Sequence, residues 1–570
     1  MNKKTSYFHN YDKKYLFMKK ITLLILLTII FGIFPFSLKA QNFLDGGQVH
    51  GNFQIDAQYY EPDDKIGADT VQEKFLMNAF GNIIYTNGDF TAGFRYELYL
   101  NPLEGFDKRL EGNGIPYRFA TYKKDKFEIT VGNFYDQFGS GLIFRAYEEW
   151  NLGIDNSVDG IRVKINPFKG VTFKGIYGKQ RYFWDKSPGI VRGADADFFL
   201  NDIFKKWQEK ETKITIGGSF VSVYQPDDPG LKLHLPLNVA AFAGRFNISN
   251  GKVNFSGEYA YKINDPDQIN NFIYKNGEAL LLTASYSQKG LGVLLAAKRI
   301  DNMSYKSNRL ESSYALDVNF LPPLTKQHTY SMAAMYPYAT QPNGEMGLQA
   351  QVVYTIPKKS KLGGKYGTSI AVNYSIVNSI DKKKINDTIP IDEYGTLGYK
   401  SDFFKVGDVK YFNDFNIEVT KKISKKWKLI ASYLNILYNI EVVEGHPGEE
   451  MVHANIGILD MTYKFTPKKS LRFEYQQLFT KQDKGDWLAF MLEYTIAPKW
   501  FFSVMDQYNY GNPDNNKQLH YYTISAGYSN KANRIALSYG RQRQGIICVG
   551  GVCREVPASN GLTLTISSSF

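Results

Sequence analysis

The chain has 570 residues, a formal net charge of +12, only two cysteines, and 81 tyrosines and phenylalanines (41 and 40). Its first 40 residues hold seven lysines and one aspartate, so removing their net +6 leaves +6 for the remaining 530 residues. That mild excess argues against a nucleic-acid-binding protein, and the even composition without a Pro/Ser-rich linker favours one large repetitive architecture over several soluble domains.

The N-terminal 40 residues have the pattern of a secretory signal peptide. Lysines precede an apolar run from Ile21 to Leu38, and a small residue, Ala40, stands before Gln41. Such a basic, apolar and small-residue order predicts export and cleavage between Ala40 and Gln41. The alternative is a transmembrane anchor, because about 18 apolar residues can just span a bilayer, but Pro35 interrupts the run.

Beyond residue 41 the hydrophobicity alternates with a period of two. In residues 90–100 the apolar series Phe90, Phe94 and Leu98 occupies one face, and Arg95 and Glu97 occupy the other. The same alternation recurs at residues 48–59, 471–477 and 486–496. These runs of about 10–13 residues exceed the usual 5–6 of soluble sheets and match strands that cross hydrocarbon.

The connections between the predicted strands alternate in length. Short turns, such as Asn250-Gly251, separate long polar segments, as in outer-membrane barrels with short periplasmic turns. Two strands per short turn predict an all-β fold, a transmembrane antiparallel β-barrel of about 22–26 strands over residues 41–570. Its larger inserts are expected to be loops at residues 136–157, 183–211, 302–345 and 380–408.

A barrel of this size encloses more space than side chains alone can fill, and its inward faces are expected to be polar. The predicted lumen-facing residues are Asp56, Arg95, Glu97, Glu128, Arg162, Arg472 and Glu474.

The last predicted strand ends in an aromatic residue. Apolar residues stand two apart before Phe570, as in the C-terminal signal with which outer-membrane barrels engage their assembly machinery. The expected partners are therefore that machinery, outer-membrane lipid and lipopolysaccharide, and further outer-membrane proteins, but no nucleic acid. A secreted β-sandwich or β-helix is the competing fold.

Two inserts interrupt the alternation. Residues 133–160 are rich in glycine, aromatic and charged residues, and Arg145 opposed to Glu148 and Glu149 is predicted to narrow the lumen; the alternative is an ordinary extracellular loop. Residues 321–345 contain prolines every few positions, which do not suit a β-ladder. This second insert is predicted to be a plug, a binding loop or a merely ordered loop.

The cysteines Cys548 and Cys553 flank a Gly-Gly pair, which would bring them together on a hairpin. In an exported protein this spacing predicts a disulfide, on a hairpin whose tip we expect to face outside. The seven histidines are scattered, with no HExxH motif and no G-x-S-x-G elbow. We therefore expect no enzyme activity, no metal site and no cofactor.

The two inserts, together with Gly46–Asn52, resemble an uncharacterised family of Bacteroidota outer-membrane β-barrel proteins. The resemblance runs over the whole mature chain and implies a barrel of unknown function, with no assigned catalytic residues.

Two functions fit these expectations. The first is a porin-like channel for small polar solutes, integral to the bacterial outer membrane, with loops constricting the lumen. The second is a non-conducting scaffold or partner subunit of an outer-membrane secretion or assembly complex. A TonB-dependent transporter is disfavoured, because the first strand is expected within about ten residues of the cleavage site and leaves no room for a separate plug domain.

Overall fold

The computed structural model describes residues 46–570 except residue 229. The predicted signal peptide, with its cleavage pair Ala40 and Gln41, lies outside the described residues. The chain divides into two compact units, of which the smaller includes the turn at Tyr85–Gly88 and the larger comprises His50–Ile84 and Asp89–Phe570. No helix among the described residues is long and apolar enough to cross a bilayer.

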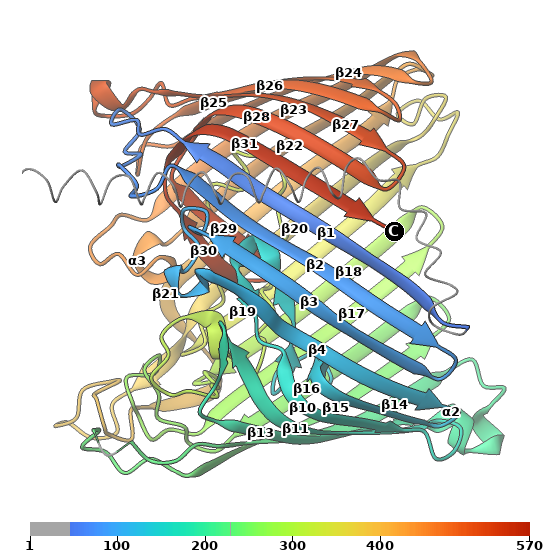
Figure 1. Ribbon diagram of the computed structural model, residues 1–570, viewed down its shortest axis with the longest axis vertical. Coiled ribbons are helices and arrows are strands. Elements are labelled where there is room, and N and C mark those ends of the chain that lie inside the picture. Colours follow the sequence, from blue (N-terminus) through green and yellow to red (C-terminus); the bar gives the residue numbers. More distant parts are fainter. Residues whose placement is uncertain (1–45, 229) are drawn as a thin grey trace, which may run out of the picture. The chain divides into compact units, whose positions relative to one another are not determined.

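The larger unit is a closed antiparallel β-barrel of 24 strands, which confirms the predicted fold class (Figure 1). Each strand pairs with the next along the barrel, and the last, β31, pairs with the first, β1, from Asn52↔Ser569 to Tyr60↔Gly561. Closure leaves no free sheet edge, as a bilayer-spanning sheet requires. The barrel strands are β1 (Gln48–Tyr60), β2 (Phe75–Asn87), β3 (Phe90–Leu100), β4 (Gly112–Lys124), β5 (Phe127–Phe134), β10 (Val158–Ile165), β11 (Val171–Tyr182), β13 (Ile190–Phe199), β14 (Lys213–Tyr224), β15 (Asn238–Asn250), β16 (Val253–Lys262), β17 (Gly277–Gln288), β18 (Leu291–Asp301), β19 (Glu345–Ile356), β20 (Thr368–Lys383), β21 (Lys400–Lys422), β22 (Trp427–Tyr438), β23 (Val452–Thr466), β24 (Lys469–Phe479), β25 (Trp487–Ile496), β26 (Trp500–Tyr508), β27 (His520–Asn530), β28 (Asn533–Gln542) and β31 (Ser559–Ser569).

The connections contain short elements of their own. They are β6 (Asp136–Gln137), β7 (Arg145–Ala146), β8 (Glu148–Glu149), β9 (Ile154–Asp155), β12 (Asp185–Lys186), β29 (Gly545–Val549), β30 (Val552–Val556), the helices α2 (Leu200–Ile203) and α3 (Ile440–Val443), and the 3-10 turns η2 (Lys108–Leu110), η3 (Trp150–Leu152), η4 (Lys205–Trp207), η5 (Tyr314–Leu316) and η6 (Asn515–Lys517).

Alternation along each strand separates an outer apolar face from an inner one. On β3, Phe94 and Tyr96 are 38% and 43% exposed, whereas Arg95 and Glu97 between them are 2% and 0% exposed. A single polypeptide thus presents rings and aliphatic groups outward, where lipid surrounds a transmembrane barrel, and keeps charges inside.

Two of the predicted loop boundaries were wrong. Residues 183–211 are not one loop, because they include β13, a strand of the barrel wall. Only residues 183–189 and 200–212 are connections. The insert at 380–408 shortens to residues 384–399, since β20 and β21 extend into it from both sides. Both predictions were wrong for the same reason: polar residues on the inner face of a long strand give it a composition like that of a loop.

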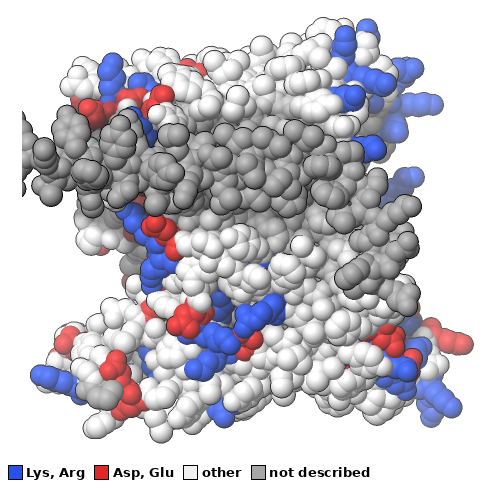
Figure 2. All heavy atoms as spheres, viewed as in Figure 1, with Lys and Arg blue, Asp and Glu red and all other residues white. Residues whose placement is uncertain are grey.

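Charge is distributed unevenly between the two ends of the strands. The eleven connections that follow β2, β4, β10, β13, β15, β17, β19, β21, β23, β25 and β27 contain 16 lysines against five acidic residues. The twelve on the other side, apart from the undescribed residue 229, contain 30 acidic against 17 basic residues. Figure 2 shows Lys and Arg along the edge of the barrel that carries α2. We call this basic side the short-turn rim and the opposite side the long-loop rim.

Candidate functional site

The site is built from inserts that fold into the lumen. In the first insert, β6 and β7 form a hairpin whose tip, Phe138–Phe144, is apolar. Phe138, Leu142, Ile143 and Phe144 are fully buried in a cluster with inward-facing residues of the barrel wall.

This apolar tip is fixed to the wall by a backbone contact at a glycine. Gly139 has a φ of +53°, and a Cβ there would lie 2.4 Å from a carboxylate oxygen of Glu258. The neighbouring backbone N–H of Ser140 donates to that carboxylate at 2.6 Å. Only a residue without a side chain allows the tip to approach the wall so closely.

The second insert, residues 302–344, joins the first through backbone hydrogen bonds. The N–H of Arg145 donates to the carbonyl of Val318, and the N–H of Phe320 donates to the carbonyl of Gly141, both at 2.9 Å. We call the two inserts, residues 136–157 and 302–344, the plug.

The plug has a second apolar contact on the opposite side of the lumen. Met332, Tyr336 and Tyr338 pack with buried residues of β20–β25, including Phe412 and Trp487. Because apolar groups cover apolar groups on both sides, this part of the lumen is packed as a protein core is.

The predicted lumen-facing charges hold the plug in place. Arg95 contacts Glu97 at 2.6 Å and Glu148 of the plug at 2.7 Å, and it also pairs with Asp155 of the plug. Arg181 bridges the same group, at 2.6 Å to Glu97 and 2.7 Å to Asp155. We call these five residues the Arg95 cluster. Burial alone raises the pKa of Asp155, but the adjacent Arg181 and Arg95 guanidiniums lower it to a net value below the usual range.

Two further ionic groups tie the plug to the wall in the same way. Arg162, which pairs with Glu128, contacts Asp136 of the first insert at 2.5 Å, and Lys174 contacts Asp136 at 2.9 Å.

On the far wall, Arg472 contacts Asp460 and Glu474 at 2.9 and 2.5 Å. The hydroxyl of Tyr330, in the second insert, donates to Asp460 at 3.0 Å. These charged residues face the lumen and contact the plug, whereas the sequence predicted only that they face the lumen.

The predicted constriction is not assembled as expected. Arg145 stacks on Tyr147 and Phe320, with its guanidinium 4.5 and 4.0 Å from the ring centroids. Glu148 belongs to the Arg95 cluster, and Glu149 accepts a hydrogen bond from the Asn151 N–H at the start of η3. Arg145 thus does not oppose the two glutamates, because Arg145 stacks on rings of the plug, Glu149 binds the start of η3, and Glu148 pairs with Arg95 of the barrel wall.

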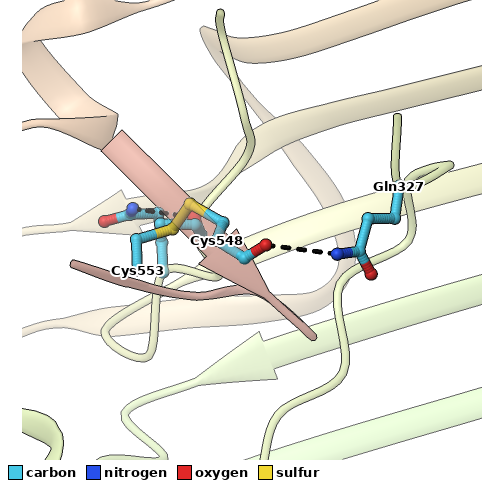
Figure 3. The surroundings of a disulfide bond; sticks show 5 residues. Gln327, Cys548 and Cys553 are labelled. Atoms are coloured by element: carbon cyan, nitrogen blue, oxygen red, sulfur yellow. Dashed lines mark hydrogen bonds between the residues drawn. A yellow bond between two sulfur atoms is a disulfide. The ribbon is translucent and has the colours of Figure 1, made fainter. Parts of the chain in front are cut away.

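The cysteine hairpin also folds inward. Cys548 and Cys553 face each other in the β29–β30 register and form a disulfide, and the side-chain amide of Gln327 donates to the carbonyl of Cys548 at 3.3 Å (Figure 3). The N–H of Thr340 donates to the carbonyl of Gly551 at 3.1 Å, and Gly551 is buried. The turn is a Gly-Gly pair with positive φ at both residues, as predicted, but its tip packs on the plug and does not project outside.

A cavity of about 840 Å³ remains between these parts. Its walls come from the inner face of β1 and β2 (Gln54, Asp56, Asn78), from the plug and from the disulfide hairpin. A second cavity of about 420 Å³ lies beside the tip of the first insert and is lined by Lys174, Asp195 and Arg245, among others.

Sequence reasoning missed several of the residues that build this site. Arg181 and Asp155 were not singled out, nor were Arg543 and Arg554 of the cavity. A signal for the plug was present: inward-facing positions of β14 and β15, such as Val221, Val223, Val239 and Ala241, are apolar where an open lumen requires polar residues. All four side chains are covered by the plug.

Comparison with known proteins assigns the sequence to a family. A family model described as a family of unknown function (DUF6029) matches residues 18–570. The chain belongs to this family. A search of curated proteins finds no match to this family member.

Solved outer-membrane structures are similar in fold. The siderophore receptor PirA from Pseudomonas aeruginosa is 8% identical with a TM-score of 0.41, covering 92% of this chain and 80% of that one. The P pilus usher (PapC) translocation pore is 9% identical with a TM-score of 0.42, covering 91% and 99%. Acinetobacter baumannii OccAB4 is 10% identical with a TM-score of 0.32, covering 81% and 98%.

Proposed function

We propose that the protein is an integral outer-membrane β-barrel of a Bacteroidota cell and that it conducts small polar solutes through the cavity beside its plug. The observation that carries the proposal is the cavity of about 840 Å³ between the plug, the disulfide hairpin and the polar inner face of β1 and β2. Its size suits a small solute, since ligand sites typically measure about 300–1,000 Å³. The proposed role is that of a conduit, without catalysis and without a cofactor.

The placement of the C-terminal strand supports membrane assembly by the barrel-assembly machinery. Phe570 is 65% exposed, and its backbone N–H and C=O both exchange hydrogen bonds of 3.0 Å with Gly51 at the barrel seam. In the proposal this aromatic end is read by the machinery before the seam closes.

The test is single-channel conductance in planar bilayers, with a variant that opens the lumen at the apolar tip of the plug, beside the cavity of about 420 Å³. Because β6 and β7 pair Asp136↔Ala146 and Gln137↔Arg145, replacing Phe138–Phe144 by Asn-Gly preserves a two-residue hairpin and removes the apolar tip. We expect small, stable conductance steps from the natural protein and larger steps from the shortened one.

A matched control keeps the length of the insert. Replacing Phe138 and Phe144 by leucine retains the apolar contact and is expected to leave the conductance unchanged. Silence of both the natural and the shortened protein in folded form would reject the channel.

The alternative, a non-conducting scaffold or partner subunit, is favoured by one observation. The plug buries apolar side chains on both sides of the lumen, which is the packing of a permanent core and not of a mobile loop. A folded protein that is silent in bilayers and retains a stoichiometric outer-membrane partner after mild extraction would support this function.

A further inference from the structure

The cavity beside the disulfide hairpin carries an unbalanced set of charges. Its acidic, basic and histidine lining residues are Asp56, Lys326, His328, Arg543 and Arg554. Two of them are neutralised by the barrel wall: Lys326 lies 3.7 Å from Glu418, and His328 lies 2.9 Å from Asp414.

Arg543 has hydrogen bonds but no acid partner. Its guanidinium donates to the side-chain carbonyl of Gln507 at 3.2 Å and to the backbone carbonyls of Gln544 and Ser331 at 3.3 and 3.5 Å. Among the described residues, no carboxylate lies within 4.0 Å of it. Burial lowers the pKa of Arg543, and the more distant Asp483 carboxylate only partly opposes this effect; an arginine keeps its proton in proteins, so its positive charge has no ion-pair partner among the described residues.

Arg554, in β30 of the disulfide hairpin, likewise has hydrogen bonds but no acidic partner among the described residues. It donates to the backbone carbonyls of Asn151 and Glu104 at 3.2 and 3.5 Å, and its guanidinium lies 4.0 Å from the ring centroid of Phe106. In the described part of the chain it too lacks a carboxylate within 4.0 Å. Burial lowers its pKa to about 10.

One anionic residue, Asp56, lines the same cavity as the two arginines. Asp56 accepts hydrogen bonds from the side-chain amide of Gln54 at 2.6 Å and from the hydroxyl of Thr565 at 2.9 Å, and within residues 46–570 (229 aside) no cation pairs with it. The unpaired charge of the lining is therefore two cations and one anion.

Aromatic rings complete the lining. Phe80 and Trp150 are stacked with centroids 4.0 Å apart, and Phe106, Tyr338 and Phe412 line other parts of the cavity. Rings offer apolar faces to the body of a ligand, while guanidinium groups pair with carboxylate or phosphate.

We infer that this cavity is a binding site for a small organic anion, a carboxylate or phosphate ester with an apolar or ring-shaped body, held by Arg543 and Arg554. The inference rests on the proposed function in that it names the solute class of the same passage. A bound anion would supply the negative partner that neither arginine has among the described residues. Without such a partner, a buried cation destabilises the fold. The disulfide fixes the short hairpin that carries Arg554 in β30 and begins two residues after Arg543.

Benzoate and benzamide are the probes, because they have the same size and ring and differ in charge. Calorimetric titration of the intact barrel in detergent is expected to give tighter binding of benzoate than of benzamide. Arg543→Gln and Arg554→Gln should each weaken benzoate binding by roughly tenfold or more, the usual range for a lost charge-assisted hydrogen bond. Asp56→Asn should strengthen it, because the opposing carboxylate is removed.

Arg534→Gln is the matched control. Arg534 also has no carboxylate within 4.0 Å among the described residues and stacks on Phe501, but it lies at the short-turn end of β28, outside the cavity. It is expected to leave benzoate binding unchanged. Heat-modified mobility on gels checks that each variant is folded.

The outcomes separate this inference from the channel. Equal affinity for the two probes, absence of saturable benzoate binding, or affinities unaffected by the three cavity substitutions would overturn the anion site even if the barrel conducts. Arginine-dependent benzoate binding in a barrel that is silent in bilayers would support the site and reject the conduit.

Discussion

Arg181 shows how the lumen charges stabilise the plug. Its guanidinium is buried and contacts Glu97 of the wall, which is fully buried, and Asp155 of the plug, whose side chain is 11% exposed. Removing one partner of such a group leaves a buried charge uncompensated, which typically costs about 3–5 kcal/mol. We predict that Arg181→Met lowers the free energy of unfolding by that amount in thermal or denaturant melts.

An exposed pair provides the control for this substitution. Arg118 is 56% exposed and lies 3.5 Å from Asp159. Surface pairs contribute about 0–1 kcal/mol, so Arg118→Met is expected to change stability by less than that. Equal effects of the two substitutions would contradict the anchoring role of Arg181.

Glu311 links plug stability to pH. Burial alone raises its pKa, but hydrogen bonds from the Tyr182 hydroxyl at 2.6 Å, from Ser313 and from Arg109 outweigh this and bring the pKa to about 2. A carboxylate whose folded pKa is depressed stabilises the fold above its ordinary pKa of 4.5, and that contribution disappears as the pH falls towards 2.

The expected result is a pH-dependent difference between two proteins. The melting temperature of the natural chain should exceed that of Glu311→Gln at pH 6–7, and the two should converge as the pH falls from about 4.5 to 2. A constant difference across this range would mean that the glutamate is not ionised when folded, or that its charge contributes nothing.

At the scale of elements, the disulfide hairpin is the part of the site closest to the sequence prediction. Cys548 and Cys553 are directly cross-strand in a hairpin with a Gly-Gly turn, with Cα atoms 4.1 Å apart. We predict that a thiol-alkylating reagent applied to intact cells, or to unfolded protein from them, labels neither cysteine until a reductant is added. Labelling of both without reductant would show that the disulfide does not form in the cell.

Local patterns predicted the elements, but not where the inserts pack. Period-two alternation, as at Phe94 and Arg95, depends only on neighbouring residues, and so does the Gly-Gly turn. The place where Phe138 packs depends on residues such as Val191 and Ala260, which belong to the same buried cluster but are distant in sequence. Nothing in the sequence of the insert itself distinguishes one that enters the lumen from one that stays outside; the available signal lies in the apolar inward-facing residues of β14 and β15.

The same limit applies to the site residues. The sequence predicted that Arg95 and Glu97 face inward, because side chains along a strand alternate between its two faces and the apolar ones must face the lipid. It did not predict that they pair with Glu148 and Asp155, because partner choice depends on the register of a plug that exists only in the folded barrel. The expectation that Arg145 would oppose Glu148 failed for this reason.

At the scale of the whole molecule, the barrel and its plug depend on each other. A 24-stranded wall encloses more volume than its own side chains fill, and the inserts supply the missing core from within the same chain. The wall in turn provides the apolar and ionic surfaces that fix the inserts. In the proposed conduit, solutes would pass through the spaces that this packing leaves, and Arg543 and Arg554 line the cavity of about 840 Å³ among them.

The charge difference between the two rims has a consequence for the membrane. The short-turn rim carries 16 lysines against five acidic residues, close to exposed rings such as Trp427 and Trp500. A lysine at the surface of an anionic leaflet contributes roughly 1 kcal/mol of attraction, which falls off within a Debye length of about 8 Å at physiological salt. We therefore expect the barrel to be more stable in bilayers that contain anionic phospholipid, and the gain to vanish at high salt.

Four lysines in one connection provide the test of this expectation. Lys358, Lys359, Lys361 and Lys365 are exposed in the turn between β19 and β20, and changing all four to glutamine should reduce the difference in melting temperature between nanodiscs of phosphatidylglycerol and of phosphatidylcholine. The control changes four exposed lysines of the long-loop rim to glutamine: Lys232, Lys481, Lys484 and Lys517. Because acidic residues outnumber basic ones on that rim, the control should leave the difference in melting temperature between the two lipids unchanged. Equal losses of this difference in the two variants would contradict a lipid contact specific to the short turns.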